Sequence, residues 1–359
     1  MTAEAREVMG PGAYDYCAGG AGDEAAMVRN VAALDARVLT PRMLGGTPGE
    51  GALGVEVPGG RLVAPILVAP MGLQRLCHPE AERATAAAAA EVGLGHCLSM
   101  FSSETPERVA AGAGTGVRWQ QIYLLRDREV TESVVRRATE AGYRALVVTV
   151  DVPVVGRRTR DMGNRFDRFR VAPPALCEDP RFVELLGARG EGASAERLID
   201  ELFPDPGSTW DDVARLVAGS SLPVLVKGVL CAGDAKLALD AGAAGVVVSN
   251  HGGRQFDRSV AAIEALGPVV DVCDRAGAPV FFDSGVRRAS HIATALALGA
   301  RAVLVGRPVL WALATGGQEE VRRVLAGLTA DLAHLLAILG VPSVAALRGI
   351  PVTAPGGGP

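Results

Sequence analysis

The residues best suited to chemistry lie in Ser249-Asn-His-Gly-Gly-Arg254, directly after a short apolar run. His251 can accept a proton near neutral pH, and Arg254 offers a planar fork that can bind a carboxylate through two hydrogen bonds. The two glycines between them permit a tight turn and a close approach of backbone to a ligand. A base beside a carboxylate-binding group is what removing a proton from a 2-hydroxy acid requires. The alternative interpretation is a loop histidine and a surface arginine without a chemical role.

Two further ionisable residues follow other apolar runs. Asp151, in Thr149-Val-Asp-Val-Pro, can orient His251 by accepting a hydrogen bond from one ring nitrogen. It can instead be a strand-end capping residue, because the runs that precede Asp151 and His251 are not consecutive. Lys227 ends Pro-Val-Leu-Val-Lys, and a lysine at a buried strand end needs an anionic partner. Reduced flavin is one such partner, while a Schiff-base lysine and a structural ion pair are the alternatives.

Glycines and arginines after the last two apolar runs form a phosphate-binding pattern. They are Asp283-Ser-Gly-Val-Arg287 and Gly306-Arg307, and backbone N–H groups and helix N-termini at such positions commonly bind phosphate. The pattern predicts a phosphate-bearing ligand, with ordinary loop glycines as the alternative. Tyr16 and Arg158 are weaker candidates: each can line a pocket, and each can equally lie on the surface.

Eight short apolar runs must position these residues. Several are continuous rather than alternating, as in parallel strands buried on both faces. Helical patterns separate them, which predicts a (β/α)8 barrel, with a doubly wound sheet as the main competitor. Eight units rather than five or six favour the barrel, and polar residues gather at one end of the runs. The runs are Pro65–Ala69, Gly95–Met100, Val117–Leu124, Ala145–Val150, Pro223–Lys227, Gly245–Ser249, Pro279–Asp283 and Ala302–Val305.

We expect a single domain over residues 1–359, with an N-terminal helical segment before a barrel at about 62–315. The connection after the fourth run is too long for an ordinary loop, and its Pro-, Gly- and charge-rich stretch predicts a mobile lid at about 157–208. Thr209 has the pattern of an N-cap for the helix that follows. A C-terminal helix at about 319–339 is expected to close the structure, and Pro355–Pro359 to be a frayed tail.

Composition excludes several classes of protein. The net charge of −4 offers no basic field for nucleic acid or an anionic membrane. Six scattered cysteines show no metal-type spacing, so we expect reduced thiols and no metal. There is no signal sequence, and no apolar run approaches the roughly 18 residues of a membrane span. We therefore predict a cytoplasmic protein.

With these residues assembled, the sequence resembles the FMN-dependent 2-hydroxy acid oxidase/dehydrogenase family from about Tyr14 to Leu347. The string Ser-Asn-His-Gly-Gly-Arg-Gln at 249–255 is highly specific for that family. The segments Arg75–Glu80, Gly156–Asn164 and Val305–Ala312 are most similar to its hydroxymandelate oxidases. The resemblance implies FMN as cofactor, a (β/α)8 barrel and a homo-oligomer, either a tetramer or an octamer.

The resemblance also implies a role for individual residues. His251 is the base, with Asp151 as its partner. Arg254, Tyr16 and Arg158 bind the substrate carboxylate, Tyr123 meets the substrate hydroxyl, and Lys227 is both catalytic and cofactor-binding. The FMN contacts are Pro70, Met71, Gly72, Ser99, Gln121, Thr149, Lys227 and Ser249, with the phosphate on Asp283, Ser284, Gly285, Val286, Arg287, Gly306 and Arg307.

Met71-Gly72 and Ser284 depart from the Thr-Ala and Gly common in the family. The missing methyl of Gly72 predicts extra space beside the flavin, and Met71, Gly72 and Phe101 predict a roomy, soft pocket wall.

We therefore expect oxidation of an (S)-2-hydroxy acid, preferably an aromatic one, to the 2-oxo acid, with O2 as acceptor and H2O2 as co-product. Two alternatives stay within FMN chemistry: a barrel oxidoreductase acting on another biosynthetic intermediate, and a dehydrogenase using a quinone-type acceptor. A third is a barrel without catalytic activity that serves as a scaffold, which the presence of His251 and Lys227 disfavours.

Overall fold

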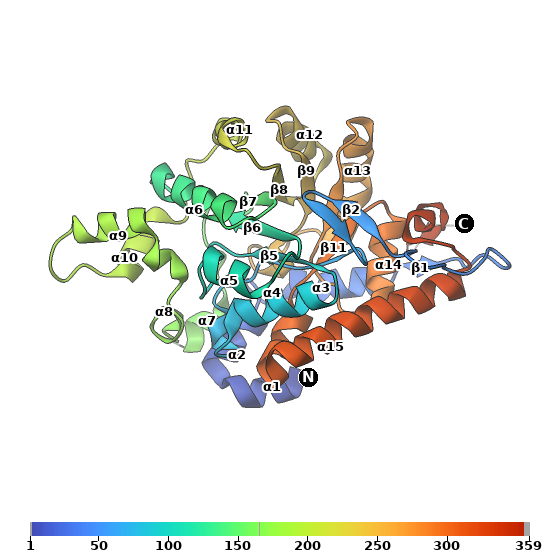
Figure 1. Ribbon diagram of the computed structural model, residues 1–359, viewed down its shortest axis with the longest axis horizontal. Coiled ribbons are helices and arrows are strands. Elements are labelled where there is room, and N and C mark those ends of the chain that lie inside the picture. The colour runs from blue at the N-terminus through green and yellow to red at the C-terminus, as the bar shows by residue number, and fades with distance from the viewer. Residues whose placement is uncertain (1, 165, 355–359) are drawn as a thin grey trace.

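The computed structural model describes residues 2–164 and 166–354, and its centre is a closed barrel of parallel strands (Figure 1). Each barrel strand lies within one of the eight predicted apolar runs or, for the fifth, extends two residues beyond it. The predicted (β/α)8 barrel is therefore confirmed. In chain order the strands are β4 (Ile66–Val68), β5 (Gly95–Leu98), β6 (Arg118–Ile122), β7 (Ala145–Thr149), β8 (Val224–Val229), β9 (Gly245–Val248), β10 (Val280–Phe282) and β11 (Ala302–Val305).

Apolar side chains fill both faces of these strands, which explains the continuous apolar runs. Inside the barrel, the rings of Trp119 and Phe281 meet edge to face at 5.0 Å between centroids. A hairpin of β2 (Val55–Val57) and β3 (Gly60–Leu62) packs against this interior cluster. The indole Nε1 of Trp119 donates a hydrogen bond to the Pro58 carbonyl oxygen at 2.9 Å, so the hairpin turn is fixed to the strands.

A helix follows each barrel strand and packs outside it, as predicted. The outer helices are α4 (Ala81–Glu91), α5 (Pro106–Gly112), α6 (Arg128–Glu140), α11 (Trp210–Gly219), α12 (Ala232–Asp240), α13 (Ala262–Arg275), α14 (Ala289–Ala297) and α15 (Arg307–Leu339). Helix α6 begins at Arg128, because Asp127 caps it by accepting a hydrogen bond from the Val130 N–H. Thr209 and Asp212 form the capping box of α11, which confirms Thr209 as its N-cap.

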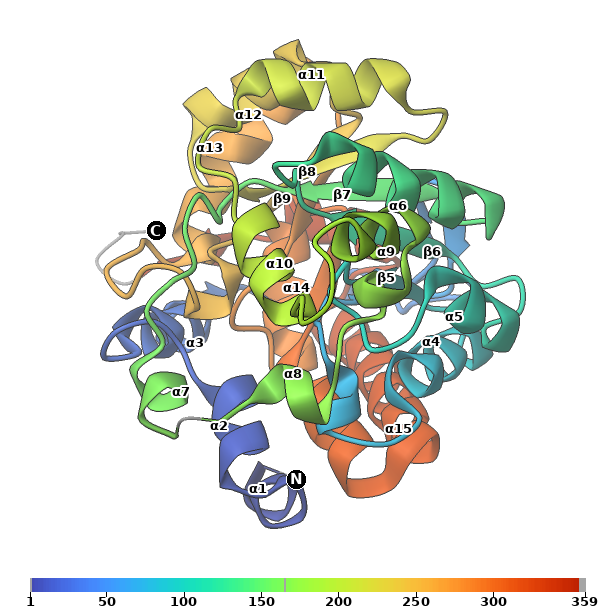
Figure 2. The same ribbon diagram turned by 90° about the vertical axis from the view of Figure 1, so that its left-hand side faces the viewer.

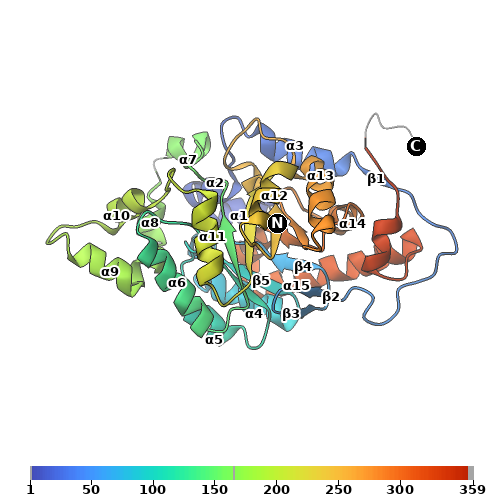
Figure 3. The same ribbon diagram turned by 90° about the horizontal axis from the view of Figure 1, so that it is seen from above.

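The long connection between β7 and α11 contains more helix than its composition suggests. It holds α7 (Thr159–Asn164), α8 (Arg168–Val171), the 3-10 helix η2 (Ala175–Glu178), α9 (Pro180–Gly187) and α10 (Ala195–Leu202). Figures 1 and 3 show α9 and α10 at one end of the molecule, opposite β1 (Val38–Leu39). Asp179 caps α9 and is paired with Arg137 of α6 at 3.1 Å, which fixes the segment to the barrel wall. The mobility of this lid stays a prediction.

The N-terminal helices are α1 (Thr2–Met9), α2 (Pro11–Ala18) and α3 (Ala25–Asp35). Figure 2 shows α1 and α2 near α15, and α1 packs against it. The C-terminal helix predicted at 319–339 is the second part of α15, which bends at Gly316 and Gly317.

The expectation that this helix closes the structure is wrong. A 3-10 helix, η4 (Val344–Gly349), and β12 (Val352–Thr353) follow it, and β12 pairs with β1 in antiparallel fashion. The predicted tail Pro355–Pro359 lies outside the described residues.

Within the described ranges, no helix is long and apolar enough to cross a membrane. The cytoplasmic location and the homo-oligomer stay predictions.

Candidate active site

One cavity lies at the carboxyl ends of the barrel strands, where the polar residues were predicted to gather. Four of the predicted residues do not line the cavity: Gln121, Thr149, Ser249 and Asp151. Gln121, Ser249 and Asp151 each form a hydrogen bond with a residue that does line it, and Thr149 forms one with Gln121. The predicted residues that do line it are Tyr16, Pro70, Met71, Gly72, Ser99, Tyr123, Arg158, Lys227, His251, Arg254, Asp283, Ser284, Gly285, Val286, Arg287, Gly306 and Arg307.

His251 and Asp151 are in direct contact, as predicted, although one barrel strand separates the strands that carry them. The Nδ1 atom of His251 lies 2.9 Å from Oδ1 of Asp151. Burial acts to raise the pKa of Asp151, but the neighbouring His251 and Lys227 outweigh it, so the net pKa is lowered. Asp151 is therefore a carboxylate that accepts a hydrogen bond from Nδ1–H of His251, and this tautomer leaves Nε2 of His251 as the proton acceptor on the cavity side.

The loop that carries His251 is held in an unusual conformation. His251 has a φ of 58°, and Gly252 and Gly253 also have positive φ, which confirms the tight turn. The hydroxyl of Ser284 accepts hydrogen bonds from the backbone N–H groups of Asn250 at 3.2 Å and Gly252 at 3.0 Å. A strained residue persists only where its surroundings fix it, and these contacts do so.

Ser284 itself has a φ of 79°, in the region that favours glycine. The common glycine at this position would lack the hydroxyl that holds the loop. Its hydroxyl donates to Oδ1 of Asp283 at 2.7 Å, so Ser284 joins the acidic partner of Lys227 to the histidine loop. The sequence analysis placed Ser284 among the residues around the FMN phosphate and noted it as a departure from the family pattern, but it did not predict this role in holding the histidine loop.

Lys227 is 3% exposed and forms the floor of the cavity. Its Nζ donates to Ser249 Oγ at 2.9 Å and lies 3.3 Å from Oδ2 of Asp283. Burial acts to lower the pKa of Lys227, but Asp283 and Asp151 outweigh it and the net pKa is raised. Lys227 therefore stays a cation, and the Schiff-base alternative is disfavoured because it needs a neutral amine.

Three arginines line the cavity without an acidic partner. Arg254, Arg287 and Arg307 are partly buried, and none forms an ion pair with a carboxylate in the described part of the chain. Burial, followed by the charges of Arg254 and Arg287, lowers the pKa of Arg307 to about 9. Because unpaired buried charge is costly, this concentration of cations fits anionic ligands.

The arginines that line the cavity form two groups, of which the first contains Arg287 and Arg307. The guanidinium of Arg307 donates to the carbonyl oxygens of Cys17, Gly19 and Gly252 and lies at the N-terminus of α15, beside Arg287. A helix N-terminus next to two arginines suits a phosphate, as the sequence predicted.

The second group surrounds Tyr16. The guanidinium carbons of Arg254, Arg158 and Arg168 lie 5.2, 5.3 and 5.6 Å from the centre of the Tyr16 ring. Arg168 was not predicted: it lies on α8 in the lid, and no motif there indicates a role. This second group can bind a carboxylate.

Part of the cavity wall is aromatic. The ring centroids of Phe101, Tyr123 and Phe203 are 4.5–5.6 Å apart, and all three residues line the cavity. Phe203, directly after α10, and Phe169 of α8 come from the lid and were missed by sequence reasoning. Burial, and then the charge of Asp151, raises the pKa of the Tyr123 hydroxyl, so it stays protonated and able to donate a hydrogen bond.

The expectation that Gly72 leaves extra space is wrong. A methyl group at this position would lie 2.8 Å from the carbonyl oxygen of Phe101 and 3.2 Å from its Cβ. The backbone of Phe101 therefore already occupies that space, and Leu73 N–H donates to the same carbonyl oxygen at 3.0 Å. Gly72 serves the close approach of two loops.

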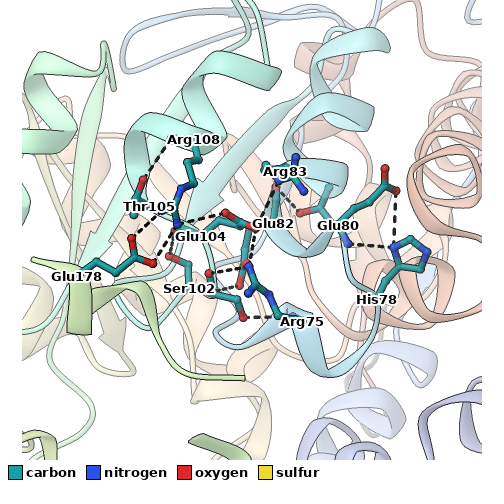
Figure 4. A network of polar contacts seen from close by, with 12 residues as sticks. Arg75, His78, Glu80, Glu82, Arg83, Ser102, Glu104, Thr105, Arg108 and Glu178 are labelled. Carbon is teal, nitrogen blue, oxygen red and sulfur yellow. Dashed lines mark hydrogen bonds and ion pairs between the residues drawn. The ribbon is translucent and has the colours of Figure 1, made fainter. Parts of the chain in front are cut away.

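A network of ion pairs around Glu104 stabilises the loops that carry Gly72 and Phe101 (Figure 4). Glu104 lies 2.7 Å from Arg75, 3.4 Å from Arg83 and 3.8 Å from Arg108. Arg108 also pairs with Glu178 of η2 at 2.8 Å, which connects the barrel loops to the lid.

The buried side chain of Glu82 joins the same two loops through hydrogen bonds to their backbone. Its Oε1 accepts from the backbone N–H groups of Gln74 and Ser103, both at 3.0 Å. The side chain of Gln74 in turn donates to the carbonyl oxygen of Met71 at 3.2 Å. Burial raises the pKa of Glu82 to about 7.

Comparisons with known proteins agree with this site. A 4-hydroxymandelate oxidase of Amycolatopsis orientalis is 42% identical over 348 residues, which cover 96% of this chain and 94% of that protein. An L-lactate oxidase of Nostoc sp. is 42% identical over 91% of this chain and 90% of its own. Among solved structures, a mandelate oxidase with (S)-4-hydroxymandelic acid superposes with a TM-score of 0.87 at 39% identity, covering 98% of this chain and 97% of its own.

The model of one protein family matches nearly the whole chain. Residues 5–351 match the family described as FMN-dependent dehydrogenase. The unpaired arginines at the N-terminus of α15 fit the phosphate of FMN, and Lys227 fits a ring that accepts negative charge. The chain belongs to the FMN-dependent dehydrogenase family and is an oxidoreductase whose cofactor is FMN.

Proposed function

We propose that this enzyme oxidises aromatic (S)-2-hydroxy acids to the 2-oxo acids and passes the electrons to O2, giving H2O2. The observation that carries the proposal is a cavity with a cationic side at Tyr16 and an aromatic side at Phe101 and Phe203, beside His251. A mandelate-like acid has a matching carboxylate and aromatic ring, both attached to the carbon that carries the hydroxyl. The similarity of the chain to a 4-hydroxymandelate oxidase and to a mandelate oxidase supports the same substrate class.

The carboxylate is bound by Arg254 and Arg158, with the Tyr16 hydroxyl as a further donor. Arg254 already donates through Nη1 to the carbonyl oxygens of Tyr16 and Gly19, both at 2.8 Å, which fixes the plane of its guanidinium. A pre-positioned fork of this kind loses little entropy when it binds a carboxylate. Arg168 adds positive charge beside it.

His251 is the base. Its Nε2 accepts a proton from the 2-hydroxy acid, and Asp151 stabilises the imidazolium that results. Tyr123 donates a hydrogen bond to the substrate hydroxyl oxygen. FMN, when bound, supplies the acceptor for the two electrons of the oxidation. The ammonium group of Lys227, fixed on Ser249 and Asp283, provides positive charge at the floor of the site, which favours this electron transfer.

The identity of the substrate can be tested with purified holoenzyme under anaerobic conditions. Flavin bleaching at about 450 nm is measured with glycolate, L-lactate, (S)-mandelate and (S)-4-hydroxymandelate. We expect the two aromatic acids to react at least about tenfold faster, in kcat/KM, than glycolate. Glycolate reacting as fast as mandelate would exclude the aromatic preference.

A variant pair assigns the preference to the cavity wall. Phe203→Ala should lower kcat/KM for mandelate by about tenfold or more and change that for lactate little, because it removes ring contacts only. Phe256→Ala is the matched control, since Phe256 is 61% exposed.

Admitting air to the substrate-reduced enzyme then tests the acceptor. Recovery of oxidised flavin with one H2O2 per flavin supports O2. Slow recovery in air but fast recovery with a quinone dye would establish the dehydrogenase alternative.

A further inference from the structure

Two cysteines meet at the edge of the active-site cavity. Cys17 is in the last turn of α2, and Cys77 directly follows the 3-10 helix η1 (Gln74–Leu76). Their Sγ atoms are 3.9 Å apart although the residues are 60 positions apart in sequence. Cys17 lines the cavity next to Tyr16, so a small molecule in the cavity lies beside this residue. Sequence reasoning treated these cysteines as ordinary core thiols.

The surroundings of Cys17 differ from those of the other buried thiols. Burial raises the pKa of Cys97, Cys177 and Cys273. The pKa of Cys17 is instead lowered, first by the hydrogen bond with the Cys77 thiol and further by the guanidinium groups of Arg254 and Arg307. The thiolate is the nucleophilic form of cysteine, so Cys17 is the more reactive member of the pair.

The backbone around Cys17 positions the arginines of the site. The carbonyl oxygen of Cys17 accepts a hydrogen bond from Nε of Arg307 at 3.3 Å. The carbonyl oxygen of Tyr16, one residue earlier, accepts from Nη1 of Arg254 at 2.8 Å. A displacement of Cys17 therefore moves the groups that orient Arg254 and also moves the Tyr16 ring.

We propose that Cys17 and Cys77 are a peroxide-sensitive dithiol whose disulfide weakens binding of the carboxylate substrate. The inference takes its oxidant, H2O2, from the proposed function. The Cys17 thiolate attacks one peroxide oxygen and becomes a sulfenic acid, and the second oxygen leaves as water after protonation. The Cys77 thiol then displaces the sulfenic hydroxyl as a second water and forms the S–S bond. In total, two thiols and one H2O2 give one disulfide and two waters.

Disulfide formation requires a local change of structure. The two sulfurs must approach by roughly 1.9 Å to reach the bonded distance of about 2.05 Å. Movement of Cys17 toward Cys77 shifts the Tyr16 and Cys17 carbonyl oxygens on which Arg254 and Arg307 rest. The base His251 and its partner Asp151 lie on other loops, so the effect falls on substrate affinity more than on the chemical step.

The test treats holoenzyme with H2O2 in the absence of substrate and removes the excess with catalase. Peptide mass mapping without reductant detects the cross-link, and KM and kcat are measured with a dye as electron acceptor. We expect a Cys17–Cys77 linked peptide, a rise in KM of about tenfold with kcat changed less than about threefold, and reversal by dithiothreitol.

Two variants complete the design. Cys77→Ser should abolish both the cross-link and the rise in KM, whereas Cys231→Ser, at an exposed position, should leave both intact. The proposal is overturned if no linked peptide forms, if the peptide forms without a change in KM, or if the rise in KM persists in Cys77→Ser. Added peroxide and a dye acceptor make these outcomes independent of whether O2 is the natural acceptor. The aromatic preference is measured separately, on untreated enzyme.

Discussion

Replacing Asp151 by Asn tests the central pair of the site. The substitution keeps the shape of the side chain and a hydrogen-bond acceptor, but it removes the negative charge 2.9 Å from Nδ1 of His251. Asp151 does not line the cavity, so substrate binding should not change. Lys227 keeps its second acidic partner, Asp283, at 3.3 Å, so FMN should remain bound. The loss should fall on the step in which His251 becomes an imidazolium.

The size of the loss follows from the geometry. A hydrogen bond to a charged group contributes about 1.5–3 kcal/mol, against about 1 kcal/mol for a neutral one, so the middle of the difference, roughly 1 kcal/mol, is the smaller of two estimates of the loss. Charge centres about 4 Å apart interact by about 4 kcal/mol at an effective dielectric constant near 20, which sets the upper limit. The rate of flavin reduction should therefore fall by about fivefold to about a thousandfold.

The assay is stopped-flow flavin reduction without oxygen, at saturating substrate. His251→Asn should cost about 10²- to 10⁴-fold or more, because it removes the base itself. The double variant should be no slower than His251→Asn alone, since Asp151 acts through His251. A reduction rate for Asp151→Asn within threefold of wild type, or multiplicative losses in the double variant, would refute the assignment.

Three further predictions concern groups that support the site. Ser284→Ala and Ser284→Gly both remove the hydroxyl that accepts hydrogen bonds from two backbone N–H groups. Alanine keeps the strain of the positive φ, whereas glycine relieves it. Ser284→Ala should therefore be less stable than Ser284→Gly by about 1 kcal/mol or more in denaturant titrations. Equal stabilities would contradict this reading of the loop. Because the pKa of Glu82 is raised from 4.5 to about 7 in the folded state, the folded protein binds more protons between these values and loses stability as pH rises through this window. Glu82→Gln should remove up to about 3 kcal/mol of that loss, and identical pH profiles of unfolding would exclude it. Arg287→Gln should weaken FMN binding by about tenfold or more, measured by flavin release, while the exposed Arg288→Gln should not.

The sequence predicts the barrel and its polar end well because the physics there is local. A strand buried on both faces must be apolar throughout, and a parallel barrel brings all strand ends to one face. Lys227 and Ser99 could therefore be assigned to one cavity before any contact was known.

The lid was less predictable. Helix α9 has eight residues and α10 has eight, too short to give a strong periodic signal between Pro, Gly and charged residues. The lid residues Arg168 and Phe203 reach the cavity through tertiary packing that no local pattern encodes. Gly72 illustrates the same limit: only the structure shows that the Phe101 backbone fills the position of the absent methyl group.

The contact between Asp151 and His251 joins residues that are far apart in the sequence. Part of what makes this contact possible can nevertheless be read from the residues of the strand between them. Their strands, β7 and β9, are separated by β8, in which Lys227 pairs with Thr149 and the register shifts between Lys227 and Val229. Gly228 lies at this irregularity with a φ of 109°, and a Cβ there would be 2.6 Å from the Cβ of Asp151. Only glycine leaves room for Asp151 to lie across β8 and reach the histidine of the next strand. The Lys227-Gly228 pair at the end of the fifth apolar run is thus part of the catalytic arrangement. Lys227 provides the positive charge, and Gly228 leaves the space through which Asp151 reaches His251.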